Sequence, residues 1–394
     1  MSNNLKGNPV EGFAEKSREA AVEGIVLLKN EGNVLPLTED DKVSVFGRPM
    51  IEYYRSGTGS GGAVNVEYTT NILDGFENSN LNFNKTIVED YKEWLKDHPF
   101  DNGGGGWACE PWFQKDMEIT ADYAKKQAES TNKAVYIIGR TAGEDKDNAN
   151  WVGSYLLTDE EKENLKNITE AFEDVCVVLN VSNIIDLKWI DEEQFKGHIK
   201  SVIIVWQGGM EGGNAVAEAL SGKATPSGKL PDTVAYDIED YPANDNFGNE
   251  LTNLYKEDIY VGYRYFETFA PEKVQFEFGF GLSYTTFDIE TVSADADDEK
   301  TQAFVSAYKE AYGDTPNQFA ADTYDAIYIM KAAAEKAGVT ADMSVSDICD
   351  AMKTAMTEIS YDGLTGEGMT WTADGEPDKA PKAVVIKDGV YTAM

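Results

Sequence analysis

The 394-residue sequence is poor in the residue types that build metal sites and histidine-dependent active sites. It contains three cysteines, which are far apart and form no CxxC pair, and two histidines without a neighbour at metal-ligand spacing. This pattern predicts neither a disulfide framework nor a zinc site, and it argues against catalysis through histidine. We therefore expect no metal and no cofactor.

Long hydrophobic runs and positive charge are scarce as well. No apolar run reaches the roughly 18 residues of a membrane-spanning helix, and the first 17 residues contain no apolar segment typical of a signal peptide. The chain has 34 Lys and Arg against 70 Asp and Glu, a formal net charge of −36. Because nucleic acid and anionic lipid would repel such a chain, we expect neither as a partner. These features together favour a cytoplasmic protein.

Apolar strands alternate with amphipathic helices over the first half of the chain. The strand-like runs are KVSVFG at 42–47, AVYIIG at 134–139, VCVVLNVS at 175–182 and SVIIVWQGG at 201–209. One helix is expected at 158–174, where Thr158 and Glu161 form a capping box. This alternation predicts an α/β fold, a three-layer sandwich with helices on both faces of a parallel sheet.

Other stretches have a less regular pattern. Near the N-terminus, Ala21, Ile25 and Leu28 lie on one helical face, which predicts a helix that Gly32 ends. IYVGYRYFETF, at 259–269, alternates as a strand does. After an acidic linker, three alanine-rich segments predict helices, at 301–313, 317–338 and 344–359.

The most acidic loop candidate, GRTAGEDKDNAN, directly follows the apolar run AVYII. Ligands of parallel α/β sheets meet the loops at the carboxyl ends of the strands. Glu144, Asp145 and Asp147 are each suited by type to general acid/base catalysis, with a pKa raised by apolar walls. Periodicity does not choose between them, and a solvated turn is the alternative interpretation.

A glycine-rich segment, SGTGSGGAVN, matches the spacing G-x-G-x-x-G at Gly57, Gly59 and Gly62. The preceding strand ends ten residues upstream and no helix pattern follows, which argues against a dinucleotide site. We expect instead a loop that brings its backbone and the hydroxyls of Thr58 and Ser60 close to a polar ligand.

Five blocks from about 12 to 290 resemble, in order, the second domain of family 3 glycoside hydrolases, the β-glucosidases and their relatives. The blocks are AAVEGIVLLKNEGNVLPL, VFGRPMIEYYRSGTGSGGAVN, GRTAGEDKDN…GSYLLTDEE, ATPSGKLPDTV and IYVGYRYFETF…FEFGFGLSYTTF. The resemblance implies a six-stranded α/β sandwich followed by the start of a fibronectin type III-like β-sandwich. It also implies hydrolysis of terminal β-linked sugars with retention, through a glycosyl-enzyme intermediate.

The resemblance assigns residues to roles. It implies that Glu144 is the acid/base residue and that Ser60 lines the sugar subsite. We add Thr58, Arg140 and Asp145 as candidate substrate-binding residues. Arg140 and Lys146 are also candidates for tuning the pKa of Glu144.

One part of the family pattern is missing. The nucleophilic aspartate of the family belongs to a separate (β/α)₈ barrel of roughly 250 residues, and no segment of this sequence resembles its motif. We therefore expect a part-enzyme for small-molecule carbohydrates that is weak or inactive alone. A barrel-bearing polypeptide or a homo-oligomer is the expected partner.

The segment from about 299 resembles instead the C-terminal piece of periplasmic binding proteins for branched-chain amino acids. FVSAYKEAYGDTPNQFAADTYDAIYIMKAA carries much of this likeness. Tyr324, Asp325 and Asp362 are either relics of a cleft or packing residues, and packing is favoured. A non-catalytic sugar-binding module and a solute-binding protein are the alternative functions.

We accordingly divide the chain into three parts. Residues 1–270 form the α/β sandwich, 271–298 form a truncated fibronectin type III-like segment with the acidic linker, and 299–394 form the binding-protein-like fragment.

Overall fold

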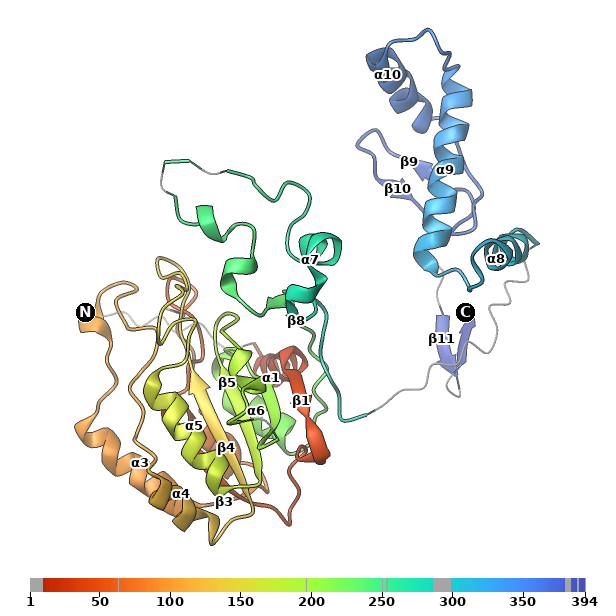
Figure 1. Cartoon of the computed structure of the whole chain (residues 1–394). Coiled ribbons are helices and arrows are strands. Elements are labelled where there is room, and N and C mark those ends of the chain that lie inside the picture. The colour runs from red at the N-terminus through yellow and green to blue at the C-terminus, as the bar shows by residue number, and fades with distance from the viewer. Residues whose placement is uncertain are drawn as a thin grey trace. The chain divides into compact units, whose positions relative to one another are not determined.

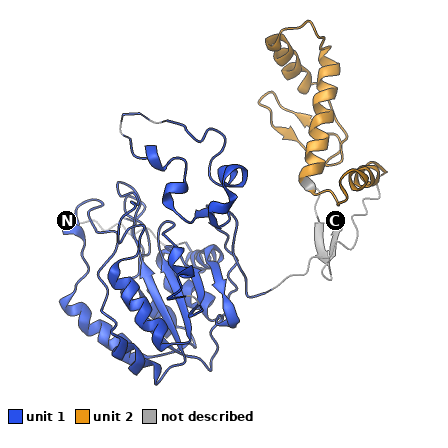
Figure 2. Cartoon of the chain, viewed as in Figure 1, with its two compact units in different colours: residues 1–287 blue, residues 288–394 orange. Residues whose placement is uncertain are grey.

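The computed structural model describes residues 10–62, 64–195, 197–249, 251–252, 254–285 and 299–379, with Gln318 by its backbone alone, and the backbone of two further strands, Val384–Lys387 and Val390–Ala393. The chain divides into two compact units, residues 1–287 and residues 288–394 (Figure 2). Each unit is described by itself. The three-part division expected from the sequence stays a prediction.

A six-stranded sheet is the middle layer of unit 1 (Figure 1). In spatial order its strands are β1 (Val26–Asn30), β6 (Ile199–Ile204), β5 (Asp174–Asn180), β4 (Lys133–Gly139), β2 (Lys42–Phe46) and β3 (Asn82–Phe83). All neighbours are parallel except β1, which pairs antiparallel with β6. The α/β three-layer class is confirmed, with one antiparallel edge strand added.

The central strands are buried on both faces, which explains their continuous apolar runs. In β4 and β5 every residue after the first is buried. Such strands require helices on each side, because apolar side chains point alternately to the two faces.

Two groups of helices cover the sheet (Figure 1). The first group is α1 (Phe13–Gly24), α2 (Ile72–Glu77) and α6 (Gly212–Leu220), and the second is α3 (Lys85–Asp97), α4 (Ala121–Ala128) and α5 (Asp159–Ala171). Helices α1 and α2 both pack on α6, and α4 packs on α5. Tyr123 of α4 donates to Asp90 of α3 at 2.7 Å, which joins the second group.

The capping box that predicts α5 is present. The Glu161 backbone N–H donates to Thr158 Oγ1 at 3.0 Å, and the Thr158 backbone N–H donates to Glu161 Oε2 at 2.8 Å. Two of the unpaired N–H groups at the helix start are thereby satisfied. The predicted helix is confirmed, although it ends at Ala171.

Two other element predictions are wrong. The expected N-terminal helix through Leu28 ends at Gly24, and Val26–Asn30 forms the edge strand β1. The segment expected as a strand at 259–269 contains the helix α7 (Tyr263–Phe269). Aromatic residues occur at alternate positions of this segment, which is the reason for the strand prediction. In the helix only Phe266 is buried.

Smaller elements complete unit 1. Strands β7 (Val234–Ala235) and β8 (Val274–Phe276) pair antiparallel. The described 3₁₀ turns are Glu31–Asn33, Arg48–Met50, Gly103–Gly105, Lys188–Asp191, Gly209–Glu211, Ile238–Asp240, Asn244–Asn246 and Pro271–Lys273. Of the β-sandwich segment expected at 271–298, residues 286–298 lie outside the described residues.

Unit 2 contains the three predicted helices. They are α8 (Glu299–Tyr312), α9 (Gln318–Ala337) and α10 (Val345–Met356), and α9 packs on α10. Asn317 and Ser344 cap the starts of α9 and α10 with their side-chain oxygens, as good N-cap residues do. Two small antiparallel pairs follow, β9 (Thr370–Trp371) with β10 (Pro377–Asp378) and β11 (Val384–Lys387) with β12 (Val390–Ala393).

Candidate active site

The candidate site lies where the strand order of the sheet reverses. From β2 the chain passes to β3 at one side, whereas β4, β5 and β6 continue on the other side. In open α/β sheets, ligands bind beyond the carboxyl ends of the strands at such a switch point. The loop after β2 contains the glycine-rich segment, and the loop after β4 contains the acidic one.

These two loops are joined by backbone contacts. The Thr58 backbone N–H donates to the Ala142 carbonyl at 3.0 Å, and Thr58 and Gly143 form a parallel bridge. The Thr58 hydroxyl donates to the Glu144 carbonyl at 3.3 Å. The structure therefore brings together two segments that the sequence pattern treats separately.

Glu144 lies at the tip of a tight turn in the acidic loop. Gly143 and Lys146 exchange two backbone hydrogen bonds of 3.0 Å each, so Glu144 and Asp145 are the central residues of this turn. The Ser60 backbone N–H donates to Glu144 Oε2 at 2.8 Å. The carboxylate is thereby held against the glycine-rich loop, and its side chain is exposed to solvent.

Gly59 makes this contact sterically possible. A Cβ added at Gly59 would lie 2.3 Å from Glu144 Cβ and 2.7 Å from Glu144 Oε2, and Gly59 has a φ of 95°. Both facts require glycine, since other residues rarely adopt positive φ and none would fit the space. Of the glycines in the G-x-G-x-x-G match, only Gly59 lies against this carboxylate. The next helix begins only at Ile72.

The electrostatics of Glu144 differ from the sequence-based expectation. The backbone N–H of Ser60, and then its hydroxyl, lower the pKa of the Glu144 carboxyl below its ordinary value. The expected raised pKa is wrong for this chain, because the carboxyl is exposed and hydrogen-bonded in its charged form. No second carboxyl is among the described groups that shift this pKa.

Asp145 faces a tryptophan. The Trp107 indole N–H donates to Asp145 Oδ2 at 2.8 Å. The indole is 54% exposed and, with Thr58 and Gly59, lines a cleft of about 470 Å³. This hydrogen bond holds the Trp107 indole against Asp145 beside the cleft, and the expected substrate-binding role of Asp145 stays a prediction.

Two further tryptophans shape the acidic loop. The Trp112 indole donates to the Asp147 carbonyl at 2.9 Å, and the Lys146 ammonium lies 4.6 Å from the centre of the Trp112 ring. Trp151 packs edge-on against Trp112. The sequence pattern did not predict a role for these tryptophans, although Trp107 and Trp112 belong to the run GGGGWACEPW and the whole chain has seven tryptophans.

Arg140 does not take the role expected for it. Its guanidinium is buried and forms two hydrogen bonds of 2.6 Å to the two carboxylate oxygens of Glu161. Its other N–H groups donate to the carbonyls of Gly139, Ser154 and Leu156. The side chain is thus committed to the base of the loop, and we withdraw it as a substrate contact.

The described residues contain no group of three or more His, Cys, Asp or Glu side chains arranged to hold a metal ion. The same part of the chain contains no helix long and apolar enough to cross a membrane.

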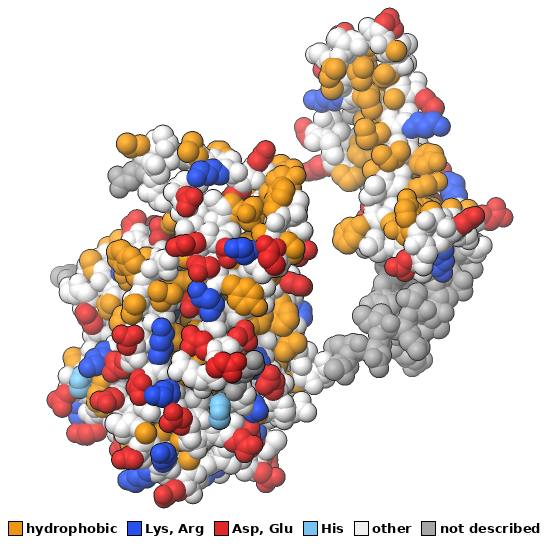
Figure 3. Space-filling model, in the orientation of Figure 1, with side chains coloured by type: hydrophobic (Ala, Val, Ile, Leu, Met, Phe, Trp, Pro, Cys, Tyr) orange, Lys and Arg blue, Asp and Glu red, His pale blue; other side chains and the backbone are white. Residues whose placement is uncertain are grey.

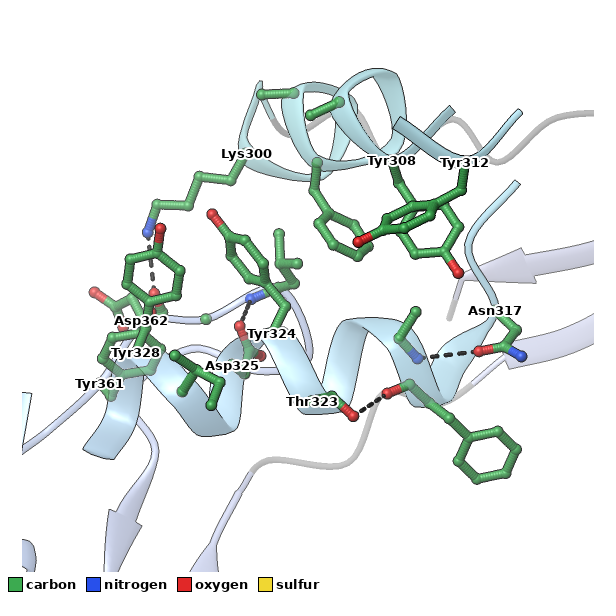
Figure 4. A pocket seen from close by; sticks show the side chains of 18 residues that line it. Lys300, Tyr308, Tyr312, Asn317, Thr323, Tyr324, Asp325, Tyr328, Tyr361 and Asp362 are labelled. Atoms are coloured by element: carbon green, nitrogen blue, oxygen red, sulfur yellow. Dashed lines mark hydrogen bonds between the residues drawn. The ribbon is translucent and has the colours of Figure 1, made fainter. Parts of the chain in front are cut away.

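Unit 2 has a separate, aromatic-lined cleft of about 1090 Å³ (Figure 4). Asp325 accepts the backbone N–H groups of Leu364 and Thr365 at 2.8 and 2.7 Å. Asp362 accepts the Gly368 N–H at 2.7 Å, and the Tyr324 ring packs 4.7 Å from the Tyr328 ring. Asp325 is buried and holds the turn after α10, as the packing interpretation predicts. Tyr324 and Asp362 are exposed, and all three residues line the cleft, so for Tyr324 and Asp362 both interpretations stay open.

Comparison with known proteins agrees with this geometry. Residues 25–284 match the glycosyl hydrolase family 3 C-terminal domain, and the chain belongs to this family. Residues 281–389 match the family described as periplasmic binding protein. The two predicted resemblances are confirmed, and together they make the chain a family 3 C-terminal part joined to a binding-protein-like part.

Individual relatives are β-glucosidases. The chain is 49% identical to the β-glucosidase of Ruminococcus albus over 286 residues, covering 73% of this chain and 30% of the relative. It is 38% identical to β-glucosidase A of Butyrivibrio fibrisolvens over 333 residues, which cover 78% of this chain and 38% of the relative. The chain thus spans about a third of the length of these curated relatives.

Solved structures agree with these relatives. A β-glucosidase from Paenibacillus barengoltzii is 59% identical, with a TM-score of 0.70 over 72% of this chain and 30% of that one. The structure of β-glucosidase 3B from Thermotoga neapolitana, in complex with α-D-glucose, is 33% identical in sequence and has a TM-score of 0.64. The match covers 72% of this chain and 39% of that one.

Proposed function

We propose that unit 1 is the acid/base part of a β-glucosidase-type hydrolase that acts on terminal β-linked sugars with retention. Glu144 protonates the leaving oxygen and then deprotonates the water that releases the sugar. The observation that carries the proposal is the contact between Glu144 and Ser60. It places a carboxylate at the switch point of the sheet, in a chain of this family.

The second half of the site has to come from elsewhere. A retaining hydrolase needs two carboxyls about 5–5.5 Å apart, and a second carboxylate at that distance would raise the pKa of Glu144. The described neighbours of Glu144 lower that pKa instead. We propose that a barrel-bearing polypeptide supplies the nucleophile, and that its approach buries Glu144 and raises the pKa toward neutrality.

A chimera tests the role of Glu144. Residues 10–285 of this chain replace the matching segment of the Ruminococcus albus β-glucosidase, and hydrolysis of an aryl β-glucoside is measured. We expect activity in the chimera and a decrease in kcat of about 10²–10⁴-fold in Glu144→Gln. Asp147→Asn is the matched control, because it neutralises an exposed carboxyl of the same loop.

The chain alone is assayed beside the chimera, and we expect almost no turnover from it. Brisk hydrolysis by the 394 residues, abolished by Glu144→Gln, would refute the proposal of a divided site. Full activity of the Glu144→Gln chimera would remove this residue from the mechanism.

A second candidate, amino acid binding by unit 2, is favoured by the match to periplasmic binding proteins. Against it, the buried hydrophobic side chains among the described residues of unit 2 are Ala333, Ala355 and Met369 alone. Hydrophobic side chains instead gather on the surface of this unit (Figure 3). We propose that unit 2 is an incomplete lobe. A thermal shift of the whole chain with leucine but not with glucose would contradict this.

We also propose a cytoplasmic location. Cys109, Cys176 and Cys349 are all free thiols, and the first and last are exposed. Exposed free thiols persist in a reducing compartment. Fractionation of the native host with an antibody against the chain tests this, and recovery in a secreted fraction would refute it.

A further inference from the structure

Asn180, the last residue of β5, bonds to each of the loops that surround the candidate site. Its side chain is completely buried. In the sheet β5 lies between β4 and β6, so its carboxyl end lies beside the beginnings of the loops that follow both of these strands. Buried polar side chains are almost always hydrogen-bonded, and the partners of this amide show which segments it joins.

The Asn180 side chain holds the beginning of the glycine-rich segment. The Tyr54 backbone N–H donates to Asn180 Oδ1 at 2.9 Å, and Asn180 Nδ2 donates to the Tyr54 carbonyl at 2.9 Å. An asparagine amide carries an acceptor and two donor hydrogens, so one side chain satisfies both backbone groups of Tyr54. Ser60, whose N–H binds Glu144, follows in the same segment.

The second donor hydrogen of the amide holds the loop after β6. Asn180 Nδ2 donates to the Trp206 carbonyl at 2.6 Å. Trp206 has a φ of 50°, which residues other than glycine rarely adopt and which persists only where the surrounding contacts fix it. This loop in turn supports the glycine-rich segment, because the Gly209 N–H donates to the Arg55 carbonyl at 2.9 Å.

The backbone of the same residue holds the acidic loop. The Arg140 N–H donates to the Asn180 carbonyl at 3.0 Å, directly after β4 ends. Glu144 follows in this loop. Asn180 therefore binds the glycine-rich segment through its side chain and the acidic loop through its main chain. A substitution at this position releases the first and keeps the second.

We propose that Asn180 is a positioning residue, which keeps Ser60 beside Glu144 by holding both loops at the carboxyl end of β5. It acts through Tyr54 and takes no part in proton transfer. Without the amide, both backbone groups of Tyr54 lose their partners inside the protein, and the glycine-rich segment has to move to pair them with water. The benefit for catalysis rests on the function proposed for Glu144, whereas the effect on geometry does not.

NMR of the full chain tests the proposal. In Asn180→Ala we expect the Tyr54 amide proton to exchange with solvent at least about 10-fold faster, because its acceptor is lost. We also expect the pKa of Glu144, followed by its carboxyl carbon, to rise toward the ordinary value, because the Ser60 N–H moves away. Asn180→Ser keeps one hydroxyl, so it gives smaller changes in the same direction and serves if Asn180→Ala does not fold.

Asn30→Ala is the matched control. The Asn30 amide exchanges the same two bonds with the backbone of Leu35, at 2.8 and 3.0 Å. Asn30 ends β1, which is antiparallel to β6, so this amide lies at the opposite end of the strands. We expect Asn30→Ala to lower stability and to leave the pKa of Glu144 unchanged.

Two outcomes would overturn the proposal. One is an unchanged Glu144 pKa in the folded Asn180 variants, and the other is an equal change in Asn30→Ala, which would indicate a general structural effect. Neither measurement requires hydrolysis. A failure of the function proposed for Glu144 is therefore seen in the chimera assay and not in these spectra.

Discussion

Single residues of the candidate site depend on close approach between distant loops. Gly59 is the clearest case, because a methyl group at this position overlaps Glu144. Gly61 lies two positions away in the same loop, with open space around it and no positive φ. Gly59 and Gly61 look alike in the sequence, but the structure requires glycine only at position 59.

We predict that Gly59→Ala destabilises the loop and separates Ser60 from Glu144. The free energy of unfolding decreases by about 1–3 kcal/mol, because strain at positive φ adds to the steric overlap. The pKa of Glu144, followed by NMR of its carboxyl carbon, rises toward the ordinary value once the Ser60 N–H is lost. Gly61→Ala is the control and changes stability by less than about 0.5 kcal/mol. Equal effects of both variants would contradict the steric argument.

Asp116 sets a pH dependence at the residue scale. Burial first, and then Glu161 nearby, raise its pKa to about 7, although the N–H groups of Arg48 and Met117 lower it. A raised pKa in the folded state means that Asp116 favours folding most when it is protonated. The stability that protonated Asp116 contributes is fully present below the unfolded pKa of about 3.9. It is lost as the pH rises through the folded pKa of about 7.

We predict that Asp116→Asn flattens this dependence. An asparagine oxygen is still able to accept both N–H groups, and it carries no charge. Between pH 5 and pH 8 the wild-type chain loses about 3 kcal/mol more stability than the variant. Urea unfolding of both proteins at pH 5 and pH 8 measures the difference. Parallel slopes in the two proteins would show that Asp116 is not the cause.

At the scale of the element, the start of α5 supports the acidic loop. Glu161 closes the capping box with Thr158, and its carboxylate also pairs with Arg140 at the base of the loop. A single residue thus joins the end of β4 to the beginning of α5. Removing one partner of a buried ion pair leaves the other charge uncompensated.

We predict that Arg140→Ala destabilises the chain by about 3–5 kcal/mol. Arg140→Met with Glu161→Leu recovers part of this loss, because neither charge remains buried. Urea unfolding of the single and double variants measures the coupling. Unchanged stability in Arg140→Ala, together with weaker sugar binding, would restore the substrate contact that the structure argues against.

Element predictions succeeded where local signals agreed with packing. The 158–174 helix has a capping box and an apolar stripe, and it was predicted almost to its end. The N-terminal prediction failed because Val26, Leu27 and Leu28 suit a helix face as well as a buried strand. Pairing with β6 selected the strand, and β6 lies far away in the sequence.

At the scale of the whole molecule, the two units differ in how completely they are packed. Unit 1 has an extensive buried core that includes both faces of the sheet. In unit 2 the described residues expose large apolar side chains, including Tyr312, Phe319 and Ile327 at 73%, 74% and 62%. Exposed apolar surface of this kind is typical of interaction surfaces. Unit 1 is therefore closely packed around its sheet, whereas the described part of unit 2 is not.

The sequence alone determined the three-layer α/β class, most helices and the family, because these follow from local periodicity, caps and the order of motifs. It also selected Glu144 by resemblance, but it did not predict the state of that carboxyl. Only the tertiary structure decided that Ser60 binds Glu144 across 84 positions, that Trp107 binds Asp145 across 38, and that Arg140 is buried. Such contacts depend on which distant loops meet at the switch point of the sheet, and that depends on the packing of the whole unit.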